Sequence, residues 1–101
     1  MGLGLNVHRL GDICTGHGCF PPRVSTEGSP DVRVNGISAH RLGDAWDSHC
    51  CPGQGCHTSV LATGSTTVRV NGIPLGRVTD LIECGSSASS SKCSPDVFSG
   101  G

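Results

Sequence analysis

The stretch Val32-Arg33-Val34-Asn35-Gly36-Ile37 returns almost unchanged as Val68-Arg69-Val70-Asn71-Gly72-Ile73. Asn-Gly between two short apolar runs is typical of a β-hairpin with a type I′ turn, because both central residues of that turn need a positive φ. Val32 and Val34 alternate with Arg33, which predicts a strand with one buried face. Because a short chain contains the same hairpin twice, the sequence predicts a fold built by repetition.

Each hairpin sequence is followed by an arginine and an aspartate, in His40-Arg41-Leu42-Gly43-Asp44 and in Gly76-Arg77-Val78-Thr79-Asp80. Partial copies stand near the two ends, as Val7-His8-Arg9-Leu10-Gly11-Asp12 and as Ser94-Pro95-Asp96-Val97-Phe98. With 16 Gly, 6 Pro and no apolar residues sustained at helical spacing, helices are not expected. We therefore predict an all-β fold of three hairpin repeats related by a pseudo-threefold axis.

The composition indicates one small domain, residues 1–101, with a thin core, because aromatic residues make up only 3 % of the chain. Such a domain needs disulfides or a bound metal for stability, and 7 Cys and 5 His can supply the side chains for them. A net charge of −1 argues against nucleic-acid binding. The first residues do not resemble a signal peptide, so we expect synthesis in the cytoplasm, where metal binding is favoured over disulfides. Cys50 with Cys51, and Cys14 with Cys19, remain as pairs that can oxidise outside a cell.

A candidate metal ligand stands at nearly the same place in each unit. His17 follows Asp12 by five residues, His49 follows Asp44 by five, and Cys84 follows Asp80 by four. A pseudo-threefold rotation brings these side chains to one axis, and His57 is the candidate for a fourth ligand. Three His and one Cys fill a tetrahedral zinc shell with no open position, which predicts a structural zinc site; iron is also compatible. The density of ligands leaves other quartets open, but we interpret five cysteines as spare, small buried residues: Cys14, Cys19, Cys50, Cys51 and Cys56.

Two further interpretations concern the repeated motif itself. His8 and His40 stand at equivalent positions before Arg-Leu-Gly-Asp, and strand alternation predicts that both point outward. Asp12 and Asp44 are expected to accept backbone N–H bonds in an Asx-type turn, which the preceding glycine permits by its unusual backbone angles. A catalytic role for these carboxylates is disfavoured because no nucleophile or open metal position is indicated beside them.

The segment from Ser29 to Asp44 resembles the repeat of PAAR proteins, which are named for a proline-alanine-alanine-arginine motif. Gly16-His17-Gly18-Cys19-Phe20-Pro21-Pro22-Arg23 resembles a subgroup of that family found in bacteria and tailed phages. The resemblance runs from about Val7 to Gly101. The motif is degraded here, to Ile37-Ser38-Ala39-His40-Arg41 and Ile73-Pro74-Leu75-Gly76-Arg77, while the turns and strands are retained.

The resemblance implies a small conical cap that is pinned near its apex by zinc held by three His and one Cys. It implies a non-enzymatic, membrane-piercing tip on a trimeric β-helical spike, either VgrG-like in a type VI secretion system or the central spike of a contractile phage tail. One cap sits on each trimer, with transient contact to the target membrane and delivery out of the cell. The chain resembles members without an effector extension.

Two other functions compete with the piercing tip. A free-standing zinc-binding adaptor that recruits effectors or another protein partner would also use a closed metal site. A metallo-hydrolase would need an open coordination position and a base beside it, and the chain contains no HExxH-type helix, so we expect no enzyme activity. The repeat architecture favours the tip over the adaptor, because one chain with three similar units can meet three equivalent edges of a trimer at once.

Overall fold

The computed structural model describes residues 4–100, and this part of the chain forms short β-strands and no helix, which confirms the all-β prediction. No segment of residues 4–100 is therefore a helix of the length and hydropathy that crossing a membrane requires. The strands pair into four two-stranded sheets. They are β1 (Leu5–Asn6), β2 (Arg33–Val34), β3 (Ile37–Ser38), β4 (Ala45–Cys51), β5 (Gly55–Val60), β6 (Arg69–Val70), β7 (Ile73–Pro74) and β8 (Phe98–Ser99).

The two Asn-Gly hairpins form as the sequence predicts. In the first, Val34 of β2 pairs with Ile37 of β3, and the turn residues Asn35 and Gly36 have φ values of 56° and 77°. The pair β6–β7 repeats this geometry around Asn71 and Gly72, with φ values of 56° and 76°. Positive φ at both central positions is the requirement of a type I′ turn, and it explains why the sequence has Asn followed by Gly.

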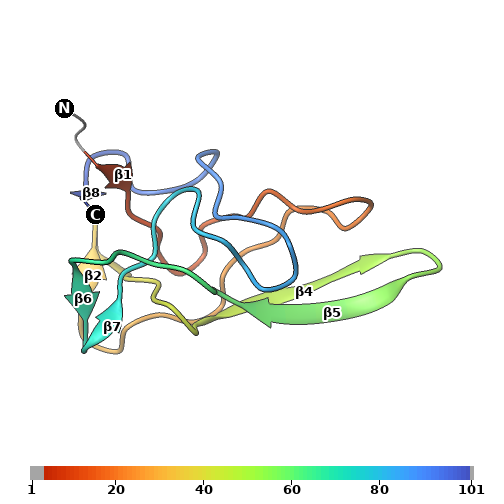
Figure 1. Ribbon diagram of the computed structural model, residues 1–101, viewed down its shortest axis with the longest axis horizontal. Coiled ribbons are helices and arrows are strands. Elements are labelled where there is room, and N and C mark those ends of the chain that lie inside the picture. The colour runs from red at the N-terminus through yellow and green to blue at the C-terminus, as the bar shows by residue number, and fades with distance from the viewer. Residues whose placement is uncertain (1–3, 101) are drawn as a thin grey trace.

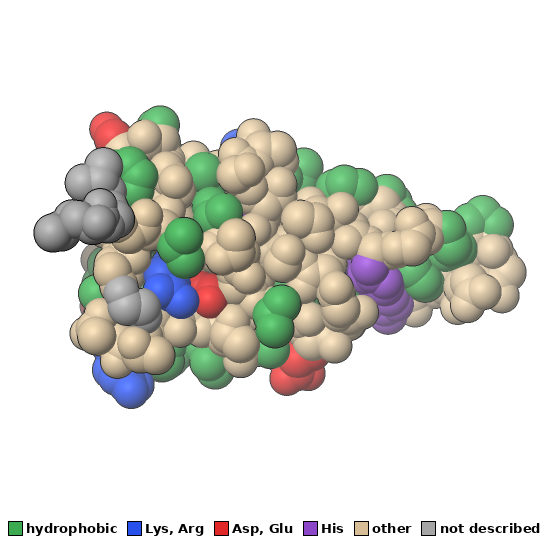
Figure 2. Space-filling view, turned by 45° about the horizontal axis from the view of Figure 1, so that its top comes forward, with side chains coloured by type: hydrophobic (Ala, Val, Ile, Leu, Met, Phe, Trp, Pro, Cys, Tyr) green, Lys and Arg blue, Asp and Glu red, His purple; other side chains and the backbone are tan. Residues whose placement is uncertain are grey.

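The third corner is made from the two ends of the described chain. β1 pairs antiparallel with β8, where Leu5 lies opposite Ser99, so the leading and trailing partial copies come together. The three small sheets lie at one end of the long axis, and the long β4–β5 hairpin extends to the other (Figure 1). The molecule measures 42 × 30 × 21 Å along its principal axes, and Figure 2 shows it narrowing toward the end with the long hairpin.

A closed triangle of backbone hydrogen bonds joins the three units. The amide of His8 donates to the carbonyl oxygen of Gly76 (3.0 Å), that of His40 donates to His8 (3.0 Å), and that of Gly76 donates to His40 (2.8 Å). Gly76 stands where the other units have histidine. A Cβ there would lie 2.9 Å from the His40 carbonyl oxygen and 2.8 Å from Leu61 Cδ2, so the close approach of the chains requires glycine.

The outward orientation predicted for His8 and His40 is wrong. Both side chains are fully buried, at 0 % exposure, and both lie against the indole of Trp46. Strand alternation fails here because β3 ends at Ser38, and the next residues run through the triangle of hydrogen bonds, where the other units cover both faces of the chain. Burial lowers the pKa of both imidazoles below its ordinary value, and that of His40 falls to about 4.

The Arg-x-x-Asp sequences form three equivalent buried ion pairs. Asp12 Oδ2 accepts the backbone N–H of Arg9 (2.9 Å) and also its Nε (2.8 Å). Arg41 with Asp44, and Arg77 with Asp80, make the same two contacts at 2.8–3.1 Å. Asp12 and Asp44 thus accept backbone N–H bonds, as predicted, and the glycine before each has a positive φ. The predicted Asx-type turn is wrong, because the donor is the residue three positions before the aspartate and not one that follows it. The side-chain ion pairs were not predicted, and they hold each turn rigidly because both charges are largely shielded from water.

The core consists of two clusters that follow the repeat. Near the broad end, Val7, Ala39 and Leu75 occupy equivalent positions five residues before each aspartate, and Val70 joins them. Farther along the axis, Cys14, Trp46 and Ile82 stand two residues after each aspartate and pack with Leu61 and Ala88. In this cluster the large indole of Trp46 packs with the small thiol of Cys14, so one tryptophan is enough to fill the space. Residues at equivalent sequence positions therefore pack together in two successive clusters.

The expectations for the cysteines need correction. Two disulfides are present, Cys19–Cys51 and Cys50–Cys56, and neither matches the pairs that the sequence suggested. Adjacent residues of a strand point to opposite faces, so Cys50 and Cys51 find different partners instead of each other. Cys14 is a buried free thiol, as expected for a small core residue, and Cys84 and Cys93 are also free.

Candidate metal centre

Three histidines and one cysteine converge between the second core cluster and the narrow end of the molecule. One ligand atom from each of His17, His49, His57 and Cys84 lies within 4.8 Å of every other. The Nε2 atom of His17 is 3.2 Å from that of His49 and 3.1 Å from that of His57. The Nε2 atoms of His49 and His57 are 2.7 Å apart. The structure thus brings together His17, His49 and Cys84, which equivalent positions in the repeat indicated, and His57, the candidate for the fourth ligand.

Each ligand is placed by a different local structure. His49 and His57 face each other across the β4–β5 ladder, which fixes their spacing by strand pairing. His17 begins a tight turn in which His17 and Phe20 exchange two backbone hydrogen bonds, with Gly16 and Gly18 at positive φ. The third unit differs, because its chain turns sharply just after Cys84, at Gly85 with φ 104°. The shorter path explains why a cysteine four residues after its aspartate replaces a histidine five residues after.

The donor set fits a tetrahedral metal ion. Two nitrogens bound to zinc at 2.0–2.1 Å are roughly 3.3 Å apart in a tetrahedron. The separations from His17 to His49 and to His57, 3.2 and 3.1 Å, are close to this value, and that between His49 and His57 is shorter, at 2.7 Å. A single proton can bridge only one pair among three converging nitrogens, whereas a cation at their centre is shared by all three. The Nδ1–H of His49 donates to the carbonyl oxygen of Pro21 at 2.8 Å, which leaves the Nε2 lone pair directed at the cluster.

The thiol of Cys84 is prepared for a charged state. Burial opposes ionisation of the thiol, but hydrogen bonds from Ser86, Arg23 and His57 outweigh it and lower its pKa to about 5. Ser86 Oγ lies 3.2 Å from the sulfur, and Nη2 of Arg23 lies 3.5 Å from it. The thiolate is the form that binds metal, so these contacts favour the ligand over the free thiol.

Arg23 and Phe20 are parts of the site that sequence reasoning did not identify. The Arg23 side chain is buried, with its guanidinium carbon 5.9 Å from the centroid of the Trp46 ring and Nη1 3.4 Å from the sulfur of Cys14. Within residues 4–100 no carboxylate forms an ion pair with it. The Phe20 ring contacts the imidazoles of His17, His49 and His57 at centroid distances of 4.8, 5.1 and 4.4 Å.

Neither residue has a counterpart in the other units, so no repeat signal could have identified them. Ser86 is different. It stands two residues after Cys84, as Cys19 and Cys51 stand two residues after His17 and His49, and this register could have drawn attention to it.

The comparison with protein-family models supports the resemblance seen in the sequence. The model of a family described as "PAAR motif" matches residues 15–90, a span that is more than half of the chain and includes all four converging side chains. No match to the chain is found among curated proteins.

Proposed function

Since this chain belongs to the PAAR motif family, we propose that it is a non-enzymatic tip that caps a trimeric β-helical spike of a secretion or phage-tail apparatus. The broad end binds the spike, one chain to three, and the narrow end leads through the target membrane. The observation that carries this proposal is the threefold repetition at the broad end. A single chain presents three equivalent corners there, as a threefold-symmetric partner requires.

Each corner is built on a serine turn that exposes a valine. The Oγ atoms of Ser29, Ser65 and Ser94 each accept the backbone N–H of the valine three residues on, at 2.9 Å in all three cases. The three valines are similarly exposed, at 36–37 %, and are Val32, Val68 and Val97. Three equal apolar contacts beside short two-stranded sheets, whose edges can accept another strand, suit a partner that ends in three strand edges.

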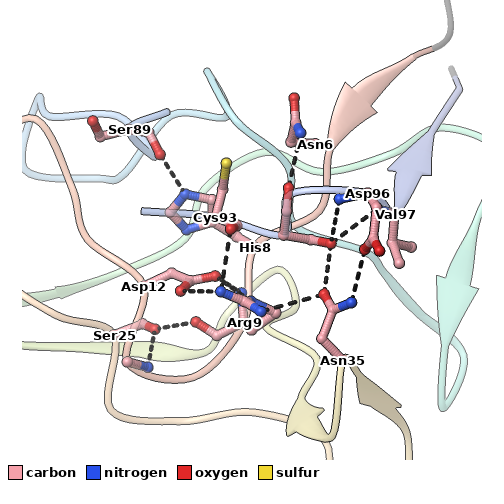
Figure 3. A network of polar contacts seen from close by, with 12 residues as sticks. Asn6, His8, Arg9, Asp12, Ser25, Asn35, Ser89, Cys93, Asp96 and Val97 are labelled. Atoms are coloured by element: carbon pink, nitrogen blue, oxygen red, sulfur yellow. Dashed lines mark hydrogen bonds and ion pairs between the residues drawn. The ribbon is translucent and has the colours of Figure 1, made fainter. Parts of the chain in front are cut away.

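The corners are cross-linked, so they form a rigid platform. Asn35 of the first hairpin accepts hydrogen bonds from Arg9 Nη1 (3.2 Å) and Ser94 Oγ (2.6 Å), and it donates to Asp96 at 2.8 Å (Figure 3). Asn71 repeats the same contacts with Arg41, Ser29 and Asp31. The hairpin asparagine therefore has two roles, because it turns the chain and joins its own unit to one neighbouring unit.

We further propose that zinc occupies the converging site, held by His17, His49, His57 and Cys84. Its task is structural, because four protein ligands leave no position for a substrate. Zinc analysis of protein purified without added metal is expected to give about one ion per chain. Cys84→Ser should lose the ion, while Cys93→Ser, which removes a free cysteine that is not in the cluster, should keep it. A well-folded wild-type protein without any transition metal would refute the site.

The capping proposal is tested with a trimeric spike fragment by native mass spectrometry and by affinity measurement. One chain per three spike chains is expected, and one chain per spike chain would contradict it. Val32→Asp, Val68→Asp and Val97→Asp should each weaken binding at least tenfold, about 1.4 kcal/mol. Leu81→Asp changes a more exposed apolar residue, at 56 %, outside the serine turns and serves as the control. With a net charge of −1, the affinity should vary little with salt.

A further inference from the structure

We propose that the disulfide Cys19–Cys51 is a second closure of the narrow end, which joins the same two units as the ligands His17 and His49 and holds them together when the metal is removed. Only the claim about removal of the metal rests on the proposed metal site. The pairing of the cysteines and their effect on the narrow end are independent of any metal.

The two cross-links are in register. Cys19 and Cys51 stand two residues after His17 and His49, and both pairs have a sequence separation of 32. Because strand side chains alternate, Cys51 lies on the same face of β4 as His49, and both are buried. The Cα atoms of Cys19 and Cys51 are 5.4 Å apart, within the usual range for a disulfide. The disulfide therefore joins the first unit to the second in the layer next to the imidazoles.

The second disulfide has a different task. Cys50 and Cys56 are directly opposed across the β4–β5 ladder and are adjacent to the opposed pair His49 and His57. Their bond closes a short segment within one hairpin and fixes the register that keeps the two imidazoles together. It does not connect the hairpin to the rest of the molecule, so it makes a matched control for Cys19–Cys51.

The narrow end has little else to hold it. In the hairpin beyond His49, Cys51 is buried, whereas residues 52–56 are all exposed. Both buried core clusters consist of residues outside this stretch. In the space-filling view, side chains of the class that includes cysteine and proline lie between the histidines and the narrow end (Figure 2). A segment without a core depends on cross-links for its order.

The bond forms by thiol–disulfide exchange with a disulfide oxidant, either oxidised glutathione or the disulfide of an oxidoreductase. The thiolate of one cysteine attacks the oxidant and forms a mixed disulfide; the other cysteine then displaces the oxidant's second sulfur. Cys19 and Cys51 lose two electrons and two protons, and the oxidant leaves as two thiols. Among the described residues, the metal is then the one cross-link between His17 and β4 in reducing surroundings, beside hydrogen bonds and ring contacts, and in oxidising surroundings there are two cross-links.

The test measures amide hydrogen exchange by NMR at His17 and Phe20, whose amides bond to each other's carbonyl oxygens. Oxidised and reduced protein are each compared with zinc and after chelation. Chelation should accelerate exchange less than threefold in the oxidised protein and at least tenfold in the reduced protein. Cys19→Ser/Cys51→Ser should behave as reduced protein under oxidising conditions, and Cys50→Ser/Cys56→Ser as oxidised protein.

Two results would overturn the inference. One is equal exchange in chelated oxidised and chelated reduced protein. The other is peptide mapping that finds Cys19 and Cys51 in different bonds. Failure of the proposed metal site gives a distinct pattern, because chelation would then change nothing in either redox state, while oxidised and reduced protein would still differ. Spike binding is proposed for the broad end of the molecule. A failure to bind the spike would therefore leave the hydrogen-exchange rates at the narrow end unchanged.

Discussion

The imidazole of His40 meets the indole of Trp46 edge to face, with ring centroids 4.9 Å apart and both side chains buried. Nδ1 of His40 donates to the carbonyl oxygen of Glu27 at 2.8 Å, so the ring is held at both its apolar face and its polar edge. The His40 ring thus packs on the largest side chain of the second core cluster, in a domain with only three aromatic residues of the Phe, Trp and Tyr class.

His40→Ala should therefore destabilise the protein by about 3 kcal/mol, because it opens a cavity beside Trp46 and leaves the Glu27 carbonyl without its donor. Lys92→Ala, which removes an exposed side chain of similar length, should stay within about 0.5 kcal/mol. Urea unfolding measures both. Similar urea midpoints for the two variants would contradict the burial of His40 and agree with the outward orientation that strand alternation predicted.

The buried imidazole also makes stability depend on pH. The pKa of His40 is lowered from 6.5 to about 4 by burial, so in acid the unfolded chain takes up a proton before the folded chain does. Its contribution is complete above pH 6.5 and is lost as the pH falls through that value toward 4, at about 1.4 kcal/mol per pH unit. His40→Phe should flatten the pH profile in this window by that slope. Parallel profiles for the variant and the wild type, both with the metal ligands intact, would contradict the prediction.

Removing one member of a buried ion pair should be costly. In Asp12→Ala the Arg9 guanidinium, whose side chain is 8 % exposed, loses its counter-charge, and we expect a loss of about 3–5 kcal/mol in unfolding free energy. Asp12→Asn keeps an acceptor for the backbone N–H and should lose less. Asp47→Ala removes an exposed carboxylate as the control and should change stability by no more than about 0.5 kcal/mol. Thermal unfolding ranks the three, and an equal effect of Asp12→Ala and Asp47→Ala would disprove the role of the pair.

Arg23 should adjust the metal site without being a ligand. Arg23→Met keeps an apolar stem against Trp46 but removes the N–H groups near the sulfur atoms of Cys84 and Cys14, and partners of this kind typically contribute 10–100-fold to metal affinity. We expect weaker zinc binding in a chelator competition and a shifted thiolate-to-metal band in the cobalt-substituted protein. Arg33→Met, at an exposed position of β2, should change neither. If the cobalt spectrum of Arg23→Met does not shift, Arg23 contributes to packing only and does not act on the metal ligands.

Local signals predicted the parts of the fold that depend on local chemistry. Asn35-Gly36 and Asn71-Gly72 determine their turns because few other residue pairs adopt positive φ twice in succession. The convergence of His17, His49 and Cys84 followed from a single assumption, that equivalent positions share an axis. The repeat carried the information, since these residues come from three separate segments of the chain.

Contacts that the repeat does not specify were missed. The burial of His8 and His40 depends on coverage by the other two units, which strand periodicity within one unit cannot report. The partners of Cys19 and Cys50 depend on which faces of β4 the cysteines occupy, and cysteine spacing alone leaves many connectivities open. Arg23 belongs to one unit only, where it fills an asymmetric space beside the single indole.

The triangle of backbone bonds among His8, His40 and Gly76 also limits how this architecture can change in evolution. Solenoid proteins lengthen by adding repeats in line, because each repeat contacts only its neighbours. Here every unit bonds to both of the others, and the last bond returns to the first unit. A fourth unit would have no donor or acceptor left on the axis, and loss of one unit would leave two exposed backbone groups at the centre. Closure therefore fixes the number of units at three, and we expect insertions and deletions to be tolerated in the loops outside the triangle.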